Sequence, residues 1–208
     1  MIEVRLASTR GSALPALILA CVLGVASPPL DAQEPVAWGD ELVFHTFSIV
    51  AVDPETGECG AAVASKYPNV GKVVPYVRSG VGAFCTQHYH NPQWGELALD
   101  LLQAGNSPEA VLAALLRDDP IAEQRQLAIM DIKGRMAVHN PTEAPQSSRY
   151  WGVMSGRFYS CQGNTLTGRS VISAMAAAYE KTVGSLTDRL MAALIAGTSY
   201  SFRTTTSC

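Results

Sequence analysis

The residues best suited to chemistry in this 208-residue chain are few and widely spaced. His88-Tyr89-His90 would place two imidazoles on one face of an extended segment, which is half of a metal site. No carboxylate or cysteine lies at a spacing that would complete the ligand set, so we interpret these histidines as loop residues and expect no metal or cofactor. Cys85 lacks an obvious local basic partner, which argues against a cysteine nucleophile.

Familiar active-site motifs are absent from the sequence: there is no G-x-S-x-G elbow, P-loop, H-E-x-x-H or G-x-G-x-x-G. Gln162-Gly163-Asn164 and Gly168 precede a helical segment, and the free N–H groups of a helix start could hold an anion. A plain glycine-rich turn and cap is the favoured interpretation. Thr46 opens a strand-like segment, but a threonine there is a good β former and indicates nothing further by itself.

Hydrophobic patterns of strand and helix type alternate along the chain. Runs rich in β-branched and aromatic residues predict strands at 45–53, 59–65, 70–74, 80–86, 126–132, 135–139 and 158–161. Apolar residues at helical spacing predict helices at 94–104, 107–116, 170–181 and 185–196. Gly105 and Gly197 are expected to end the first and the last of these helices. Residues 140–157 are polar and are interpreted as a loop.

The order of strands, two helices, strands and two helices predicts an α+β fold in which helix pairs cover the outer faces of β-sheets. The chain is 48% hydrophobic and 16% charged, which suffices for one domain with a sizeable core and excludes intrinsic disorder. Its net charge of −3 and its lack of a basic run exclude a nucleic-acid-binding surface.

Residues 1–32 have the three parts of a secretory signal peptide. Arg5 and Arg10 precede an apolar run over residues 13–26, and a turn-prone Ser-Pro-Pro follows it. The run is shorter than the roughly 20 residues that a transmembrane helix needs. We therefore expect a secreted or periplasmic protein that meets the membrane only through this peptide, with a leader at 33–44 ahead of the domain.

Four cysteines would remain after signal-peptide removal, and export permits disulfides among them. Cys85 and Cys161 each end a strand-like run and are the pair we choose, with buried free thiols as an equal alternative. Cys21 lies inside the apolar run of the signal peptide, which argues against a lipoprotein anchor.

Several separate blocks of the sequence resemble one known family. HTFSIVAVDPETGECGAAVAS, VGKVVPYVRSGVGAFCTQ, NPQWGELALDLLQAG and the QGN before the alanine-rich helix are similar to the bacterial and archaeal family called domain of unknown function 1028. The resemblance runs from Thr46 to about Gly197, so the domain is placed at 45–197. That family is placed in the N-terminal nucleophile (Ntn) hydrolase superfamily. The resemblance implies a four-layer αββα sandwich, which agrees with the element order.

The resemblance also implies that Thr46 is a catalytic nucleophile. In Ntn hydrolases a Thr, Ser or Cys becomes the first residue of the mature chain, and its α-amine, with a pKa of about 8, takes the proton from its side chain. Thr46 Oγ1 would attack the carbonyl of a small amide or peptide. Asp53 or Lys66 is expected to tune the amine. Ser65 and Ser48 are expected to form hydrogen bonds within the site.

Four amide side chains complete the site that the resemblance implies. Oxyanion or substrate contacts are expected from Gln87, Asn91, Gln162 and Asn164. Ser48, counted with them as a substrate contact, shares a strand face with Thr46 because side chains alternate along a strand.

Two features depart from the family pattern. In many members the threonine follows the initiator methionine, whereas here a second cut between His45 and Thr46 is required. The family usually adds an apolar strand after the last helix, whereas residues 198–208 are polar, so we expect a missing last strand or a truncated end. An exposed sheet edge would favour a homo-oligomer, and Cys208 could add an intermolecular disulfide.

Two functions follow from these observations. The first is an exported Ntn-type amidohydrolase, with cell-wall amides suggested as substrates because some relatives carry peptidoglycan-binding modules. The second is a non-catalytic binding or assembly module on the same scaffold, in which Thr46 is never freed.

Overall fold

The computed structural model describes residues 45–141 and 150–201, which form eight strands, five α-helices and one 3-10 helix. The α+β class expected from the sequence is confirmed. In chain order the elements are β1 (Thr46–Asp53), β2 (Glu58–Ser65), α1 (Val70–Val73), β3 (Pro75–Arg78), β4 (Gly82–His88), α2 (Gln93–Gln103), α3 (Pro108–Leu116), η1 (Ala122–Gln124), β5 (Arg125–Asp131), β6 (Met136–His139), β7 (Tyr150–Gly156), β8 (Tyr159–Leu166), α4 (Arg169–Lys181) and α5 (Leu186–Ser201).

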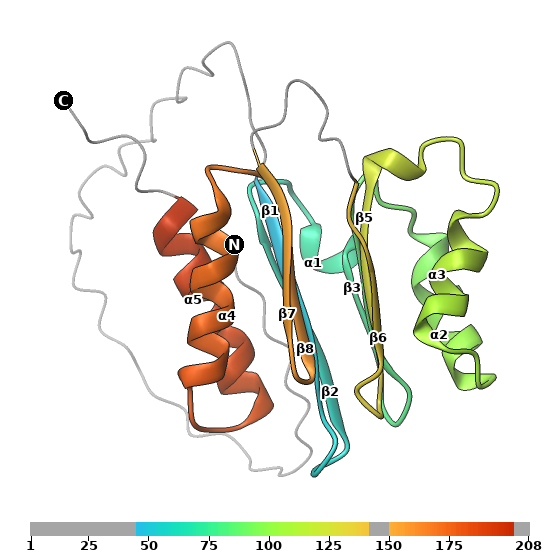
Figure 1. The fold of residues 1–208 in the computed structure, drawn as a ribbon, viewed down its shortest axis with the longest axis horizontal. Coiled ribbons are helices and arrows are strands. Elements are labelled where there is room, and N and C mark those ends of the chain that lie inside the picture. The colour runs from blue at the N-terminus through green and yellow to red at the C-terminus, as the bar shows by residue number, and fades with distance from the viewer. Residues whose placement is uncertain (1–44, 142–149, 202–208) are drawn as a thin grey trace, which may run out of the picture. The chain divides into compact units, whose positions relative to one another are not determined.

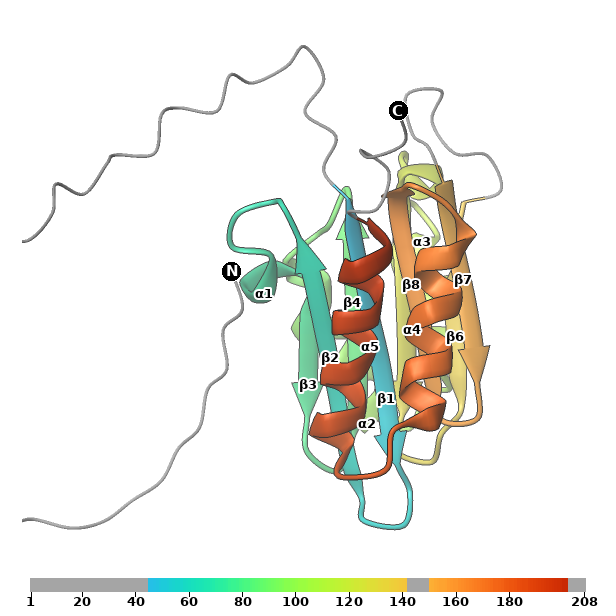
Figure 2. The ribbon, with the colours of Figure 1, turned by 90° about the vertical axis from the view of Figure 1, so that its left-hand side faces the viewer.

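The first sheet has the strand order β2-β1-β8-β7, and all its neighbours are antiparallel. Because side chains alternate along a strand, β1 turns Phe47, Ile49 and Ala51 to one face. On that face they pack with apolar residues of α4 and α5, such as Met175 and Ala193. These two helices therefore cover the outer face of the first sheet (Figures 1 and 2).

The second sheet has the order β3-β4-β5-β6 and is also antiparallel. Phe84, Leu127 and Ile129 point outward and pack with Leu99 of α2 and Val111 of α3. This helix pair covers the outer face of the second sheet, on the side away from α4 and α5 (Figure 1). Ser107 begins α3 by accepting a hydrogen bond from the Ala110 N–H over 3.2 Å, the cap expected from the sequence.

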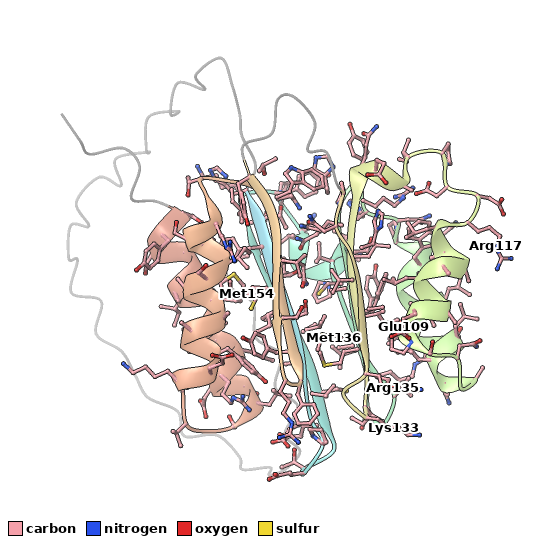
Figure 3. All side chains as sticks on the ribbon, viewed as in Figure 1. Glu109, Arg117, Lys133, Arg135, Met136 and Met154 are labelled. Atoms are coloured by element: carbon pink, nitrogen blue, oxygen red, sulfur yellow. The ribbon has the colours of Figure 1, made fainter. Side chains whose placement is uncertain are left out.

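The inner faces of the two sheets pack against each other and change in character along the strands. Toward one end the layer is apolar, with Val50 and Val52 of β1 packed against Ala83, Ala128 and Met130 of the second sheet. Figure 3 shows Met136 between the sheets and Met154 on the helix-covered side of the first sheet. At the other end the same inner faces carry serine, threonine, glutamine and asparagine side chains.

The predicted strand at 70–74 is wrong, because residues Val70–Val73 form the short helix α1. Asn69 has φ 60° in the left-handed region, and its carbonyl accepts the Lys72 N–H over 2.9 Å, so the chain turns instead of extending. Val74 is nevertheless buried in the layer between the sheets. The β-branched composition of this segment reflects that burial and not a strand.

The expected loop at 140–157 is wrong over Tyr150–Gly156, which forms the edge strand β7 and pairs with β8. The predicted short strand at 158–161 is the first part of β8, which continues through Gln162-Gly163-Asn164 to Leu166. These three residues are therefore ladder residues and not the turn before a helix. Residues 142–149 lie outside the described residues.

Gly197 does not end α5, which continues to Ser201. A Cβ atom at Gly197 would lie 2.8 Å from Phe47 Cε2 and 2.9 Å from Met175 Cγ. The glycine therefore lets α5 lie close to β1 and α4, which is a packing role. The predicted signal peptide and leader, and positions 202–208 with Cys208, lie outside the described residues. Within the described residues no helix is long and apolar enough to cross a membrane.

The chosen Cys85–Cys161 disulfide is wrong. Both residues are free thiols, and they lie in different layers of the fold. Cys85 packs between the two sheets, whereas Cys161 packs between the first sheet and its helices. Burial raises the pKa of the Cys85 thiol to about 12 and also raises the pKa of Cys161, so both behave as small apolar groups.

We expect Gly197→Ala to destabilise the protein although alanine is the better helix former. The helix propensity gained is about 1 kcal/mol, whereas overpacking a closed core costs about 1–3 kcal/mol. Gly71→Ala is the matched control, because nothing lies within 4 Å of the added atom in that helix. Urea unfolding of the two variants and the wild type measures both effects. Equal or greater stability of Gly197→Ala would show that this contact is not tight.

Candidate functional site

Thr46 is the first residue of β1 and lies at the polar end of the layer between the sheets. Its partners across the first sheet are Ser65 on β2 and Asn164 on β8. Thr46 is 8% exposed, and its Oγ1 lies 2.9 Å from Ser65 Oγ. The Tyr67 N–H donates to the same serine oxygen over 3.0 Å, which leaves the serine proton available to Thr46 Oγ1. Two hydroxyls therefore meet at this end of the sheet.

Behind these hydroxyls, a chain of hydrogen bonds crosses from the first sheet to the second. Gln162 Nε2 donates to Ser48 Oγ over 2.7 Å, and Ser48 Oγ donates to Gln87 Oε1 over 2.7 Å. Gln87 Nε2 then donates to Gln126 Oε1 over 2.6 Å. All four residues are at most 1% exposed. The chain therefore holds the two sheets together at a point from which water is excluded.

Gln126 of β5 is the centre of this network. Its Oε1 also accepts from Asn164 Nδ2 over 3.2 Å. Its Nε2 donates to Asn140 Oδ1 over 2.6 Å and to the carbonyl oxygens of Gly163 and Gly152 over 2.9 and 3.3 Å. One amide side chain thus links β5 to β7 and β8 and fixes Asn164, the cross-strand neighbour of Thr46.

Aromatic side chains from both sheets meet at the same end of the layer. The His88 ring lies edge-on to Trp151 of β7, with the ring centroids 4.4 Å apart. His88 Nδ1 lies 2.8 Å from the Gln124 carbonyl oxygen, and burial lowers the pKa of this histidine. Its imidazole is therefore mostly neutral at neutral pH and packs as an aromatic ring.

Two exposed tyrosines flank this end. Tyr67 is 48% exposed and lies edge-on to His90, with the ring centroids 6.3 Å apart. Tyr89 is 54% exposed, and its carbonyl oxygen accepts from the guanidinium of Arg125. Arg125 also binds Asp119, with Nη2 3.0 Å from Oδ1, and this bond lowers the pKa of the carboxyl. The loop after β4 is thereby fixed to Arg125 at the start of β5.

The residue that precedes the candidate nucleophile is also held in place. One ring nitrogen of His45 contacts the Thr165 carbonyl oxygen. Thr165 has φ 52°, which is unfavourable for a β-branched residue. Its Oγ1 donates to the Asn164 carbonyl oxygen over 2.7 Å. The end of β8 thus adopts an unfavourable conformation where it meets the His45–Thr46 peptide.

Most of the site residues expected from the sequence are brought together by the fold. Six of them lie at the polar end of the layer and are linked by hydrogen bonds: Thr46, Ser48, Ser65, Gln87, Gln162 and Asn164. Lys66 follows Ser65 directly and is exposed. Asn91 lies after β4, where its Oδ1 accepts the Gln93 N–H over 3.1 Å at the start of α2. The buried amides bond mainly to one another and shape the site from behind, and Gln162 Oε1 alone among their oxygen atoms has no partner within the described residues.

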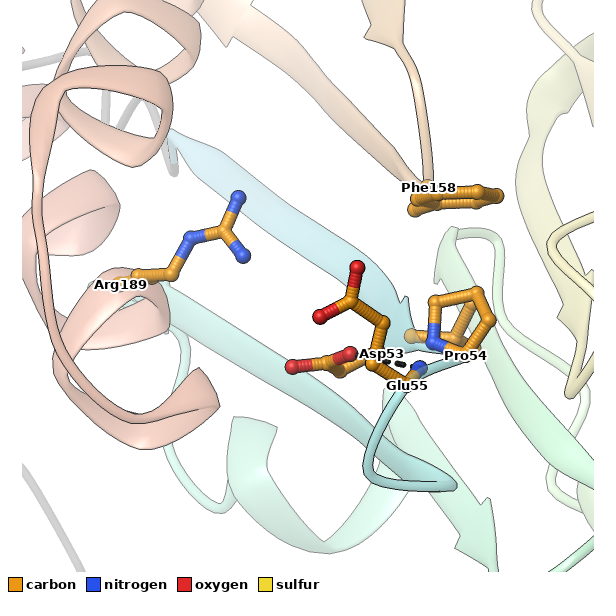
Figure 4. A pocket seen from close by; sticks show the side chains of 6 residues that line it. Asp53, Pro54, Glu55, Phe158 and Arg189 are labelled. Atoms are coloured by element: carbon orange, nitrogen blue, oxygen red, sulfur yellow. Dashed lines mark hydrogen bonds between the residues drawn. The ribbon is translucent and has the colours of Figure 1, made fainter.

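Asp53 is separated from this group. It is the last residue of β1, and a strand rises about 3.3 Å per residue, so it lies about 23 Å from Thr46 along the strand. The expected role of Asp53 in tuning the Thr46 amine is therefore wrong by distance. Asp53 instead lines a separate cavity at the other end of the layer (Figure 4).

Metal-binding geometry is not found at His88 and His90. His88 contacts the Gln124 carbonyl and Trp151, whereas His90 contacts Tyr67. Within residues 45–141 and 150–201, no three His, Cys, Asp or Glu side chains come together as a ligand set.

Comparison with known proteins identifies the family of this chain. The family model described as "Family of unknown function (DUF1028)" matches residues 46–200. The chain belongs to the DUF1028 family. It is also similar to the crystal structure of protein SPO2555 from Silicibacter pomeroyi, which is described with the same family model, at 33% identity and a TM-score of 0.69. That match covers 74% of this chain and 70% of the relative. No curated protein matches the chain.

Sequence reasoning missed several residues of the DUF1028 protein that shape the site, chiefly Gln126, Asn140 and Trp151. One signal was present for Gln126, because it is a polar residue at an inward position of the fully buried strand RQLAIMD. Its partners are distant in sequence: Gln87 lies 39 residues away and Asn164 lies 38 residues away. A single sequence does not reveal such pairings.

We expect Gln126→Glu to make stability depend on pH. The new carboxylate would replace an amide donor that faces three oxygen atoms, so burial and repulsion would raise its folded pKa above the unfolded value of about 4.3. Above that pH the folded state binds more protons than the unfolded state. As the pH rises above about 4.3, the free energy of unfolding of Gln126→Glu, relative to wild type, should therefore fall by up to about 1.4 kcal/mol per pH unit.

Urea unfolding at several pH values from 4 to 8 measures this difference. Gln93→Glu is the matched control, because it makes the same change at an exposed residue in the first turn of α2. A carboxylate is favourable there, so the control should be flat or gain up to about 1 kcal/mol as the pH rises. A pH-independent difference for Gln126→Glu would mean that the network tolerates a charge.

Proposed function

We propose that this DUF1028 protein is an exported Ntn-type amidohydrolase that uses Thr46 as its nucleophile. The observation that carries the proposal is the position of the Thr46 hydroxyl. It sits at the first residue of β1, almost buried, and within hydrogen-bond distance of a second hydroxyl at the polar end of the layer. A nucleophile at the start of a central strand becomes N-terminal through one peptide cut.

The absence of a side-chain base supports the same assignment. Among residues 45–141 and 150–201, the only side-chain hydrogen-bond partner of Thr46 Oγ1 is Ser65. A hydroxyl is a weak nucleophile until a neighbouring base takes its proton. The α-amine of Thr46, if freed from His45, would be attached to the adjacent carbon and would supply that base at neutral pH, since its pKa is about 8.

The layers of the fold are compatible with the Ntn architecture. Two facing antiparallel sheets have a helix pair on each outer face (Figure 1). This arrangement supports the αββα sandwich that the family resemblance implies. In the proposed assignment β1 is the central strand that begins with the nucleophile.

In the proposed reaction, Thr46 Oγ1 attacks the amide carbonyl carbon while the α-amine takes the hydroxyl proton. The C–N bond of the substrate then breaks, the amine leaves with that proton, and an ester to Thr46 remains. Water hydrolyses the ester and restores the hydroxyl. Because Ser65 Oγ already accepts from Tyr67, its own proton can stabilise the negative charge on Thr46 Oγ1.

One observation favours the second function, a binding or assembly module with an uncut chain. His45 is half-buried, and its ring contacts the Thr165 carbonyl, so the residue ahead of Thr46 is anchored to the sheet. In that case the Thr46 nitrogen stays in an amide and has no basicity. The state of the His45–Thr46 bond therefore separates the two functions.

We expect the full chain, exported by a bacterial host, to be recovered with Thr46 as its first residue. Periodate cleaves the 1,2-amino alcohol of an N-terminal threonine to an aldehyde, which a hydrazide probe labels. Intact mass and hydrazide labelling together measure the outcome. Recovery of a single species that begins near Gln33 and resists labelling would refute the amidohydrolase and favour the binding module.

Thr46→Ala tests the nucleophile. We expect loss of amine release from a panel of N-acyl amino acids, dipeptides and cell-wall peptides, and loss of labelling by a β-lactone probe that acylates hydroxyls. Thr46→Ser should retain part of both, because it keeps the hydroxyl. Thr56→Ala, in the exposed turn after β1, is the control and should behave as wild type. Hydrolysis that survives in Thr46→Ala would remove this residue from the mechanism.

A further inference from the structure

A small cavity opens at the end of the sheet layer away from Thr46 (Figure 4). It is lined by the end of β1, the turn after it, the β7–β8 turn and α5, through residues Val52, Asp53, Pro54, Glu55, Phe158 and Arg189. Its volume is about 190 Å³. Pockets for drug-sized ligands measure roughly 300–1,000 Å³, so this cavity suits only a small molecule.

Arg189 supplies a fixed positive charge to the cavity. Its guanidinium carbon lies 4.1 Å from the centre of the Tyr179 ring, and its Nε donates to the Tyr179 carbonyl oxygen over 3.4 Å. Among the described residues it forms no ion pair with a carboxylate. The stem and the Nε are thus held by α4, while the terminal nitrogens remain for another partner. Such a planar guanidinium is suited to binding a carboxylate.

Negative charge lines the facing side of the cavity. Asp53 Oδ1 accepts the backbone N–H groups of Glu55 and Thr56 over 2.9 and 3.4 Å, which fixes the aspartate in a turn. Figure 4 shows the carboxylates of Asp53 and Glu55 across the cavity from the guanidinium of Arg189. The cavity therefore separates a cation from two anions instead of pairing them.

Phe158 supplies a fixed apolar wall. Its backbone is in the left-handed region at φ 68°, and its carbonyl accepts the Val52 N–H over 3.0 Å. Gly134 lets the ring lie close, because a Cβ there would lie 2.3 Å from Phe158 Cδ1. A phenylalanine held in this unfavourable conformation at a cavity is a position where strain accompanies a site.

A buried tyrosine lies behind Arg189. Tyr179 is 0% exposed, and its hydroxyl has no hydrogen-bond partner among the described residues. Burial raises the pKa of this tyrosine, while Arg189 lowers it and Asp53 raises it. Tyr179 is not among the residues that line the cavity, so it contributes to the site by holding Arg189 in place.

We propose that this cavity binds a free α-amino acid with a small side chain. Its carboxylate would bind Arg189, its ammonium group would bind Asp53 and Glu55, and its side chain would lie against Phe158 and Pro54. A metal cation is disfavoured by Arg189, and an anion is disfavoured by the two carboxylates, whereas a zwitterion matches both. The site lies about 23 Å from Thr46 along β1 and does not depend on the proposed hydrolase activity.

Isothermal titration of the full chain with alanine, serine and valine tests the ligand class. Alaninamide, which lacks the carboxylate, and N-acetylalanine, which lacks the ammonium group, are the matched controls. We expect saturable binding of at least one amino acid and at least tenfold weaker binding of both analogues. Equal binding of the analogues, or no saturable binding of any amino acid at millimolar concentration, would overturn the proposal.

Two variants place the binding at this cavity. Arg189→Met keeps an unbranched stem over Tyr179 but removes the charge, and Asp53→Asn keeps an oxygen for the turn but removes the charge. Each should weaken amino-acid binding at least tenfold while melting within a few degrees of wild type. Arg117→Met, on the far helix pair, should bind as wild type (Figure 3). Thr46→Ala should also bind as wild type, which separates this site from the proposed hydrolase. Unchanged binding by Arg189→Met would exclude the cavity.

Discussion

The structure depends on one constraint, which is that the polar groups buried between the two sheets pair with one another, with Gln162 Oε1 the one oxygen of this network left without a partner among the described residues. Each of these groups, left alone, would lose about 1–3 kcal/mol of hydration without compensation. Gln126 avoids this loss by using both ends of its amide, as an acceptor for Gln87 and Asn164 and as a donor to Asn140 and two carbonyl oxygens. If only apolar contacts joined the two sheets, one sheet could shift relative to the other at little cost. A network of directed hydrogen bonds favours one register between the sheets.

That register has a consequence for β1, which carries different chemistry at its two ends. At the start of the strand, the inward positions are hydroxyls next to the amide network, and at the centre they are Val50 and Val52. At its end the strand leaves the layer at Asp53, beside Arg189 and Phe158. The apolar middle separates the two polar ends, because no chain of side-chain hydrogen bonds among the described residues connects them. The candidate nucleophile and the charged cavity can therefore act independently.

The sequence predicted the elements whose burial pattern is local. The β1–β2 hairpin, α2, α3, α4 and the start of α5 have apolar residues at clear periods, and their positions were confirmed within a few residues. The hydrophobic pattern gave wrong predictions where contacts between residues far apart in the sequence determine the structure. Strand β7 contains two glycines and a serine beside its apolar residues, and it is a strand because β8 pairs with it. Gly197 is a packing residue because Phe47 and Met175 close around it. Asp53 was predicted to act on Thr46, but the two residues lie at opposite ends of one strand.

The arrangement at Thr46 also bears on why a cut after His45 would change its chemistry. In the uncut chain the Thr46 nitrogen is an amide that can only donate, and within the described part of the chain the hydroxyl bonds to a serine and to no side-chain base. After a cut, the same nitrogen becomes an amine at a residue that is 8% exposed. Desolvation favours the neutral form of an amine, which is the form that accepts a proton. The burial that fits Thr46 into the sheet would then also favour its own base, so the position of the residue in the fold and its proposed reactivity share one physical cause.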